Sequence, residues 1–403
     1  MPRIPPSLFW RARREISPMA ARLLPACRDL DSAANELRWI REHVRDTRSP
    51  IPAGLRVWEL CERRGRGVPL QYVLGTQPFG DLEIKCRPGV LIPRPETEAY
   101  TLYLASLIAQ EQSKLPQSLR ILDFCTGTGC IPLLLLHSLL NITKSRTPST
   151  HSPTHIEIQG IDVSPDAIRL AKLNHAHNIA LGLLPPPCTP TPEGNDNNAN
   201  NRPSYNLTFT RQDIFSPSLL STLTSSSSSS SPSPPNPSNP NPENNHPEEI
   251  ALLISNPPYI SRAGFARSTA RSVRNHEPRL ALVPDPGPAA SVPNSVSISR
   301  SATDHHDCEP EDIFYARLLR LTAQLRPRRA LFEVGDAEQA ERVVGMLAGR
   351  QHCGEVGAWY KVIEIWRDEP GAAGYEEKRI AGRKVGVRGE GNGRAVYLFR
   401  GGG

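Results

Sequence analysis

The stretch Asp123-Phe124-Cys125-Thr126-Gly127-Thr128-Gly129-Cys130 lies between two apolar segments, of which residues 120–124 are predicted to be a strand and residues 131–140 a helix. Glycines in the turn between them let the backbone approach a ligand closely, at the carboxyl end of a strand where open α/β sheets bind ligands. The stretch does not have the spacing of the dinucleotide fingerprint, and it lacks the lysine of a phosphate-binding loop. It therefore predicts a ligand site without naming the ligand.

The next predicted strand, residues 156–161, leads into Asp162 through Gly160 and Ile161. A carboxylate at the end of this strand can accept hydrogen bonds from the hydroxyls of a ribose. The glycine-rich stretch and Asp162 together predict a cofactor that contains a nucleoside.

A third motif, Ser255-Asn256-Pro257-Pro258-Tyr259-Ile260, follows a predicted strand over residues 250–255. The two prolines fix the backbone and present the Asn256 amide and the next carbonyl as rigid acceptors, while Tyr259 supplies a flat face. Such a group fits a planar substrate that carries an NH2 group, either a carboxamide or the amino group of a base. The motif alone is also explained by a proline-stiffened loop with a capping asparagine; beside the other two motifs it indicates a substrate site.

Strands and helices alternate along the chain from residue 96 onward. This alternation predicts an α/β fold with a mostly parallel sheet that is covered by helices on both faces. The predicted strands are residues 120–124, 156–161, 207–211, 250–255, 330–334, 361–366 and 394–399, and the predicted helices are residues 96–110, 131–140, 165–178, 311–325 and 337–347.

The N-terminal part of the chain has a different composition. Residues 1–28 hold six arginines against one acid, with apolar residues between them, which is typical of a mitochondrial presequence. A basic disordered tail and an RNA-binding patch are the alternatives. Apolar residues at three- and four-residue spacing then predict a small helical domain over residues 29–75, and residues 76–95 are predicted to be a hairpin linker to the main domain, residues 96–403.

Three segments are rich in Pro, Ser and Asn, namely residues 184–204, 216–249 and 284–310. Their composition buries too little apolar surface to offset the entropy of ordering, so they are predicted to be disordered insertions.

Composition excludes several classes of protein. The chain has 403 residues and a net charge of +6, and its eight cysteines form no CxxC pair, which favours neither a zinc ribbon nor a disulfide scaffold. No apolar run is long enough to span a membrane. We therefore expect a protein of a reducing compartment, with no metal site and no membrane contact.

The motifs also resemble a known family. The chain resembles the HemK/PrmC-type glutamine methyltransferases, which transfer a methyl group from S-adenosylmethionine to the glutamine of the Gly-Gly-Gln motif in peptide-chain release factors. The residues that carry the resemblance are 69–75, 78–98, 123–130, Asp162, 212–213, 256–259, 276–278, 281–282, 332–335 and the closing strands.

This resemblance implies a class I methyltransferase domain with a Rossmann-like seven-stranded sheet and a small N-terminal helical domain. It implies that Asp162 holds the ribose and that Asp213 and Ile214 flank the adenine. The other cofactor-binding positions that it implies are Asp123, Cys125, Thr126, Gly127, Thr128, Gly129 and Asn256. Three positions depart from the family pattern: Cys125 stands where many members have glycine, Ile214 stands where an aromatic residue is common, and His276 replaces a common aromatic residue before Glu-Pro.

The resemblance also implies the substrate side of the site. Asn256 and the Pro257 carbonyl hold the glutamine amide and Tyr259 packs against it, which makes these three the candidate catalytic residues. Pro258, Arg94 and Glu96 are the further candidates for substrate binding.

The expected function is therefore methylation of a release factor in the mitochondrial matrix, with the release factor as the partner and no direct sequence-specific contact with nucleic acid. A DNA or RNA adenine-N6 methyltransferase is the alternative enzyme, because it shares the Asn-Pro-Pro-Tyr motif. It would need a recognition region with interleaved basic and aromatic residues, whereas the insertions offer Ser, Pro and Asn. A non-catalytic assembly factor that keeps the fold is the third reading.

Overall fold

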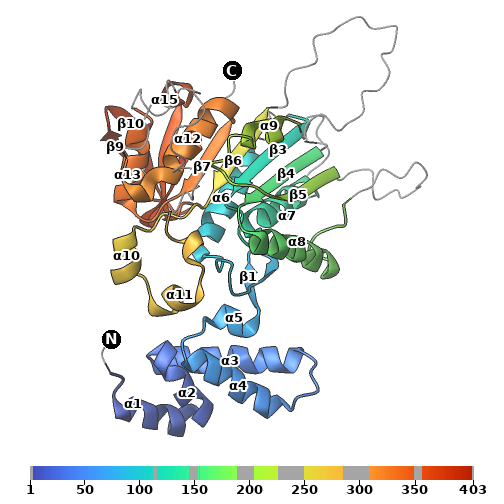
Figure 1. Ribbon diagram of the computed structural model, residues 1–403, viewed down its shortest axis with the longest axis vertical. Helices are drawn as coiled ribbons and strands as arrows, with labels where there is room; N and C mark the ends of the chain where they lie inside the picture. The colour runs from blue at the N-terminus through green and yellow to red at the C-terminus, as the bar shows by residue number, and fades with distance from the viewer. Residues whose placement is uncertain are drawn as a thin grey trace, which may run out of the picture.

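The computed structural model describes residues 3–111, 116–144, 153, 155–187, 204–225, 249–284, 308–348 and 356–401. A bundle of helices at the N-terminus lies below a larger sheet domain, and a short helix and a hairpin connect the two (Figure 1).

The N-terminal bundle has its own core, in which Leu23, Leu24, Leu37 and Ile40 are fully buried. Its longest helix is capped by Asp29, whose Oδ1 accepts a hydrogen bond of 2.7 Å from the backbone N–H of Ser32. The bundle consists of α1 (Pro6–Arg11), a π-helical turn (Ala12–Ile16), α2 (Pro18–Cys27), α3 (Leu30–Asp46), α4 (Ala53–Gly65) and α5 (Leu70–Leu74).

The bundle begins earlier than the predicted residue 29. Residues 6–27, which lie within the predicted presequence, form α1, the π-helical turn and α2, and α2 places Leu23 and Leu24 against α3 and α4. The prolines and arginines of this segment favoured a presequence or a tail in the sequence, so the apolar face of α2 was not recognised as part of a core. Whether the segment also directs targeting stays a prediction.

The hairpin is formed by β1 (Thr76–Phe79) and β2 (Leu82–Lys85), and it is anchored to the sheet domain by two asparagines of α8 (Pro165–Ala180). The Oδ1 atom of Asn174 accepts from the backbone N–H of Lys85 at 2.7 Å, and that of Asn178 accepts from the N–H of Glu83 at 3.1 Å. These contacts fix the linker segment against the domain that it leads into.

The large sheet is mixed, and in the described part of the chain it has nine strands in the order β5-β4-β3-β6-β7-β11-β8-β10-β9. Neighbours from β5 to β7 are parallel, whereas β11 is antiparallel to both β7 and β8. The strands are β3 (Ser118–Phe124), β4 (His155–Asp162), β5 (Ser204–Arg211), β6 (Ile250–Ser255), β7 (Arg329–Glu333), β8 (Val362–Glu369), β9 (Tyr375–Ile380), β10 (Arg383–Arg388) and β11 (Glu390–Phe399).

Helices cover both faces of this sheet, as the alternation predicted. Along β3, Leu119 and Ile121 pack with α6 and α7, and Leu122 and Phe124 pack on the opposite face with α12 and α13. The helices of the domain are α6 (Pro95–Gln110), α7 (Cys130–Lys144), α8, α9 (Leu219–Ser225), α10 (Arg262–Arg267), α11 (Arg271–His276), α12 (Ile313–Leu325), α13 (Ala337–Met346) and α15 (Val356–Trp359), with 3-10 turns at Arg279–Ala281 and Pro310–Asp312.

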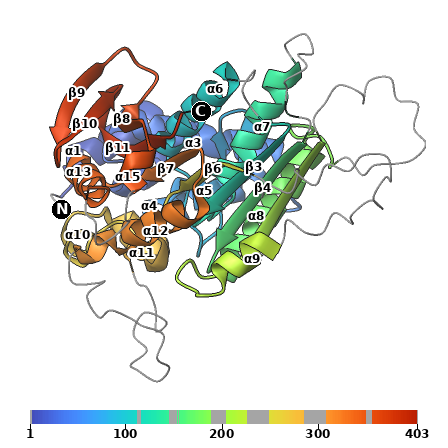
Figure 2. The same ribbon diagram turned by 90° about the horizontal axis from the view of Figure 1, so that it is seen from above.

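The seven-stranded prediction missed β9 and β10, which extend the sheet beyond β8 (Figure 2). Five of the six residues of β9 are exposed, and four consecutive charged residues occupy its centre, so it has no alternation of apolar and polar side chains. Its neighbour β10 buries only Val385, Gly386 and Val387.

Parts of the predicted insertions belong to the fold. Leu184 is buried in the core, and residues 219–225 form α9, which buries Leu219 and Leu223. Asp312, just past the third insertion, is also buried. The remaining parts, residues 188–203, 226–248 and 285–307, lie outside the described residues. Within the described ranges, no helix combines the length and the apolar character that crossing a membrane requires.

Candidate functional site

A cavity of about 290 Å³ opens at the carboxyl ends of β3, β4 and β6. This is the position where open α/β sheets bind ligands. Of the residues that the sequence predicted, Arg94, Cys125, Thr126, Gly127, Thr128, Asp162, Asp213, Ile214, Asn256 and Pro258 line it.

The glycine-rich turn needs small residues for two separate reasons. Gly127 and Gly129 have φ angles of +54° and +78°, and a Cβ atom on Gly129 would lie 3.0 Å from the Cβ of Ala171. Cys125 also has a positive φ, of +61°, although it carries a side chain. The backbone there has the left-handed conformation that favours glycine. A cysteine in place of the family's usual glycine therefore strains the backbone at this position.

Asp162 connects this turn to the next strand. Its Oδ2 accepts a hydrogen bond of 2.9 Å from the backbone N–H of Gly127, and its Oδ1 accepts one of 2.8 Å from the N–H of Ser164. Burial raises the pKa of this carboxyl above its usual value, whereas these backbone hydrogen bonds act in the opposite direction. The carboxylate therefore lies at the cavity wall, oriented by backbone donors on two sides.

Asp123 lies behind the cavity wall and is fully buried. Neither of its carboxylate oxygens has a hydrogen-bond partner among the described residues. Burial raises the pKa of Asp123 to about 8. Both oxygens can therefore still accept hydrogen bonds, and they lie beside the turn that lines the cavity.

The far end of the cavity is more apolar. Asp213 accepts a hydrogen bond of 2.9 Å from the backbone N–H of Phe215, and Ile214 and Phe314 form the wall next to it. Arg317 donates to the Ile214 carbonyl at 2.8 Å and so fixes this segment against α12. An apolar wall beside a carboxylate suits a flat heterocycle with polar edges.

The Asn-Pro-Pro-Tyr motif leaves the end of β6 beside the same cavity. Ser255 donates to the Phe124 carbonyl at 2.8 Å, which joins β6 to β3 where the two motifs begin. Pro257 and Pro258 are buried, and Asn256 is half-buried at the cavity wall. The Tyr259 hydroxyl donates to Glu333 at 3.2 Å, and its burial raises the pKa of Tyr259.

A second cavity of about 560 Å³ adjoins the first and shares Asn256 and Arg94 with it. Its lining is more polar than that of the first cavity. Each of its three arginines is paired with an acid outside the cavity lining: Arg94 with Glu277, Arg342 with Asp312, and Arg394 with Asp368. The other residues that line it include Tyr259, Ser261, Thr269, Glu311, Gly335, Asp336 and Gln339.

The segment between the two cavities is held by a buried acid. Glu277 accepts hydrogen bonds from Arg94 at 2.8 Å and from the backbone N–H of Ile92 at 3.1 Å. This contact gives a physical role to the Glu-Pro motif near residue 277, which the sequence analysis used for the family resemblance only.

Four predicted site residues do not line either cavity. Asp123, Gly129 and Pro257 lie behind the wall, where they shape the strand end and the two turns. Glu96 lies in the first turn of α6 and is absent from both linings.

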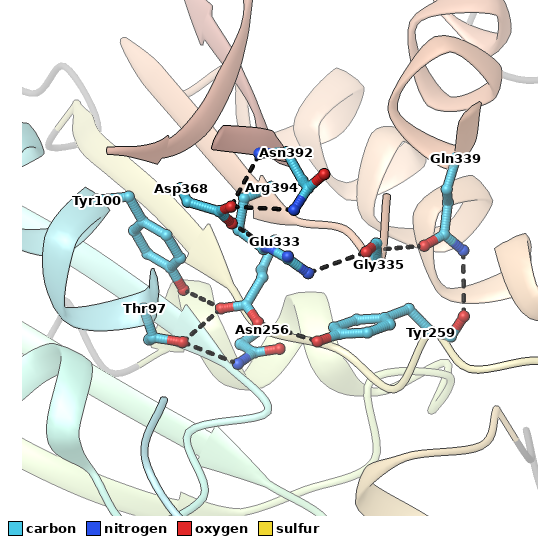
Figure 3. A network of polar contacts seen from close by, with 10 residues as sticks. All are labelled: Thr97, Tyr100, Asn256, Tyr259, Glu333, Gly335, Gln339, Asp368, Asn392 and Arg394. Atoms are coloured by element: carbon cyan, nitrogen blue, oxygen red, sulfur yellow. Dashed lines mark hydrogen bonds and ion pairs between the residues drawn. The ribbon is translucent and has the colours of Figure 1, made fainter. Parts of the chain in front are cut away.

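The sequence analysis missed a polar network behind Asn256, which Figure 3 shows. Thr97 and Tyr100 of α6 and Tyr259 donate to the carboxylate of Glu333, and Gln339 accepts from the backbone N–H of Gly335. Thr97 and Glu333 lie in segments that carry the family resemblance, but neither segment by itself indicates this network. Among the described residues, no cluster of His, Cys, Asp or Glu is arranged to hold a metal ion.

Comparison with known proteins found no matching family model. The chain is 33% identical over 284 residues to the mitochondrial MRF1 N(5)-glutamine methyltransferase MTQ1 of Saccharomyces cerevisiae, covering 70% of this chain and 68% of that protein. It is 32% identical to the probable MRF1 mitochondrial N(5)-glutamine methyltransferase mtq1 of Schizosaccharomyces pombe, covering 70% and 73%. The release factor glutamine methyltransferase of Mycolicibacterium smegmatis is 32% identical, covering 68% and 75%.

Proposed function

Because this chain belongs to the family of release factor N5-glutamine methyltransferases, we propose that it methylates the Gly-Gly-Gln glutamine of a peptide-chain release factor on its side-chain nitrogen, with S-adenosylmethionine as the methyl donor. The observation that carries this proposal is the position of Asn256, which lies at the boundary of the two cavities. One cavity suits the donor and the other suits a peptide.

The first cavity fits S-adenosylmethionine. Asp162 is an oriented carboxylate for the ribose, and Ile214 and Phe314 provide an apolar wall for the adenine, with Asp213 next to them. The glycine-rich turn leaves room for the methionine part, since its positive φ angles bring bare backbone to the cavity. When bound there, the cofactor supplies an electrophilic methyl group on a positively charged sulfur.

The second cavity fits an uncharged polar peptide. Its three arginines are each paired with an acid, and Glu311 and Asp336 also line it, so the described lining offers hydrogen bonds but no unpaired cation. A phosphate backbone would require unpaired cations, so this lining supports a protein substrate over a nucleic acid. Gly-Gly-Gln has no charged side chain and a terminal carboxamide for Asn256 to recognise.

The residues of the chain act by positioning the amide. In this proposal the Asn256 Oδ1 accepts an N–H hydrogen of the glutamine amide and Tyr259 packs against its plane, whereas Pro257, which lines neither cavity, fixes the backbone between Asn256 and Tyr259. Orientation of this kind supplies several kcal/mol in enzymes, and the acceptor binds more strongly as positive charge develops on the nitrogen. No base is needed beforehand, because the nitrogen loses its proton after it has gained the methyl group.

We place the enzyme in mitochondria, which is supported by the two fungal relatives that are named mitochondrial. We propose the matrix as the compartment, because the arginine-rich N-terminal segment has the composition of a matrix-targeting sequence.

The test is a methylation assay with peptides that contain Gly-Gly-Gln or Gly-Gly-Glu and with an adenine-containing oligonucleotide. The parent chain should methylate only the first, and Asn256→Ala should lower the rate at least about 100-fold, as the loss of one preorganised polar contact does. Asn206→Ala, on the exposed side of β5, is the matched control and should keep the parental rate. Preference for adenine, or cofactor binding without turnover on any substrate, would contradict the proposal.

A further inference from the structure

Glu333 is a buried acid that touches neither cavity, yet it organises the wall behind Asn256 (Figure 3). It ends β7, and its carboxylate accepts hydrogen bonds from three hydroxyls. Thr97 donates to Oε2 at 2.6 Å, Tyr100 donates to the same oxygen at 2.9 Å, and Tyr259 donates to Oε1 at 3.2 Å. A carboxylate without a hydrogen can only accept, so all three hydroxyls must point their hydrogens toward it.

The hydrogen on Thr97 is decisive, because a threonine hydroxyl has only one. Since that hydrogen is donated to Glu333, the same oxygen can offer only lone pairs to its other neighbour. That neighbour is Asn256, whose Nδ2 lies 3.5 Å from the Thr97 Oγ1. The contact is long, as polar contacts in ligand-free active sites often are.

The orientation of Asn256 follows from the direction of these two hydrogen bonds. An amide that faces a lone pair must present its NH2 group, which leaves its Oδ1 on the opposite side. Figure 3 shows the Asn256 oxygen pointing away from Thr97. If Thr97 donated to Asn256 instead, the amide would turn over and would present N–H groups where the substrate needs an acceptor.

We propose that Glu333 is a positioning residue that fixes, through Thr97, which end of the Asn256 amide faces the substrate. This inference rests on the proposed function, since it assigns Asn256 the role of acceptor for the glutamine amide. Glu333 also holds the Tyr259 hydroxyl, so one carboxylate orients both polar side chains of the motif. Arg394, the nearby cation, pairs with Asp368 at 2.8 Å and leaves the Glu333 oxygens to the hydroxyls.

The first test compares variants of Thr97 by the kinetics of Gly-Gly-Gln methylation. Thr97→Val keeps the volume and removes the hydroxyl that links Glu333 to Asn256, so kcat should fall at least about tenfold while the KM for the peptide stays within about twofold. Because Thr97 also lines the first cavity, the Kd for S-adenosylmethionine is measured in each variant. Thr97→Ser restores the hydroxyl and should restore kcat. The matched control is Thr101→Val, one turn further along α6, which is also fully buried but donates only to the backbone carbonyl of Thr97.

The second test replaces the carboxylate itself. Glu333→Gln has the same shape but carries an NH2 group, so at least one of the three hydroxyls can no longer donate to it. Its kcat should fall at least about tenfold with cofactor affinity retained, as calorimetry will show. A parental kcat in Thr97→Val would overturn the inference. So would equal losses of kcat in Thr97→Val and Thr97→Ser.

A third readout does not depend on turnover. Selective ¹⁵N-asparagine labelling reports the Asn256 side-chain amide by NMR, and the loss of its signals in Asn256→Asp identifies them. These signals should shift in Thr97→Val and stay near their parental positions in Thr97→Ser and Thr101→Val. Unmoved signals in Thr97→Val would overturn the inference that Thr97 orients Asn256, even in an active enzyme. A parent chain that does not methylate the peptide would instead contradict the proposed function. The spectrum would then still test whether Thr97 orients the Asn256 amide.

Discussion

The backbone N–H of Gly127 donates a hydrogen bond of 2.9 Å to the carboxylate of Asp162, so the end of β4 holds the turn that follows β3. The two motifs that predicted a nucleoside cofactor are thus in direct contact. A change at Asp162 therefore affects the proposed ribose site and the shape of the glycine-rich turn together.

Asp162→Ala should weaken S-adenosylmethionine binding by about 1.5–3 kcal/mol, the usual value of hydrogen bonds to a charged group. This corresponds to a roughly 10- to 150-fold higher Kd, which titration calorimetry will measure. Asp166→Ala, an exposed acid in the first turn of α8, is the control and should leave the Kd unchanged. An unchanged Kd in Asp162→Ala would remove this residue from the cofactor site.

Cys125 has a φ of +61°, which glycine adopts at little cost. Cys125→Gly should therefore be more stable than Cys125→Ala by about 1 kcal/mol, because both lose the sulfur but only the alanine keeps the strained backbone with a Cβ. Urea unfolding of the two variants measures this difference. An alanine variant as stable as the glycine variant would show that the turn bears no strain at this position.

Burial raises the pKa of Asp123 to about 8 in the folded chain, from 3.8 for an ordinary aspartate. Between these pH values the unfolded chain releases this proton while the folded chain keeps it. The free energy of unfolding should therefore fall as the pH rises through this range, by up to about 1.4 kcal/mol per pH unit from this group. Asp123→Asn removes the effect, so its stability relative to the parent should improve steadily from pH 5 to 8 in cofactor-free urea titrations. Parallel stability curves would contradict the assignment.

Two deletions distinguish the part of the second predicted insertion that belongs to the fold from the part that does not. Joining Ser225 to Glu249 through a short Gly/Ser linker should leave the unfolding midpoint unchanged, because the removed segment is rich in Ser, Pro and Asn. Removal of residues 216–249 also removes Leu219 and Leu223, which are fully buried, and should cost roughly 2–5 kcal/mol for each leucine. Equal midpoints would show that α9 adds nothing to the core.

Deletion of residues 1–28 should destabilise the N-terminal bundle, since it removes Leu23 and Leu24 from the core of that bundle. Limited proteolysis should then cut α3 and α4 at protease concentrations that leave the full chain intact. A bundle equally resistant in both chains would mean that it is complete from residue 29.

The sequence predicted the elements that carry a strong periodic signal. The strand at residues 250–255 and the start of α8 at Pro165 agree with the structure, and α6 begins at Pro95, one residue before its predicted start, because apolar runs, helix-capping residues and proline mark these elements locally. The part of the cavity lining that directly follows strand ends was predictable for the same reason.

The features that were missed depend on contacts between distant parts of the chain. Thr97 and Glu333 are 236 residues apart, and nothing near either residue indicates that they meet. Likewise, the apolar face of α2 is recognised as core only when α3 and α4 lie beside it. The position of β9 in the sheet depends on its pairing with β10.

The β9–β10 hairpin determines what the sheet exposes at its edge. Without it, β8 would end the sheet with Ile363 and Ile365 beside an open row of backbone donors and acceptors, which is a template for aggregation. In its place the outermost strand carries Glu376, Glu377, Lys378 and Arg379, all of them exposed. Consecutive charges on both faces of an edge strand disfavour pairing with another chain, so the hairpin protects the solubility of the protein.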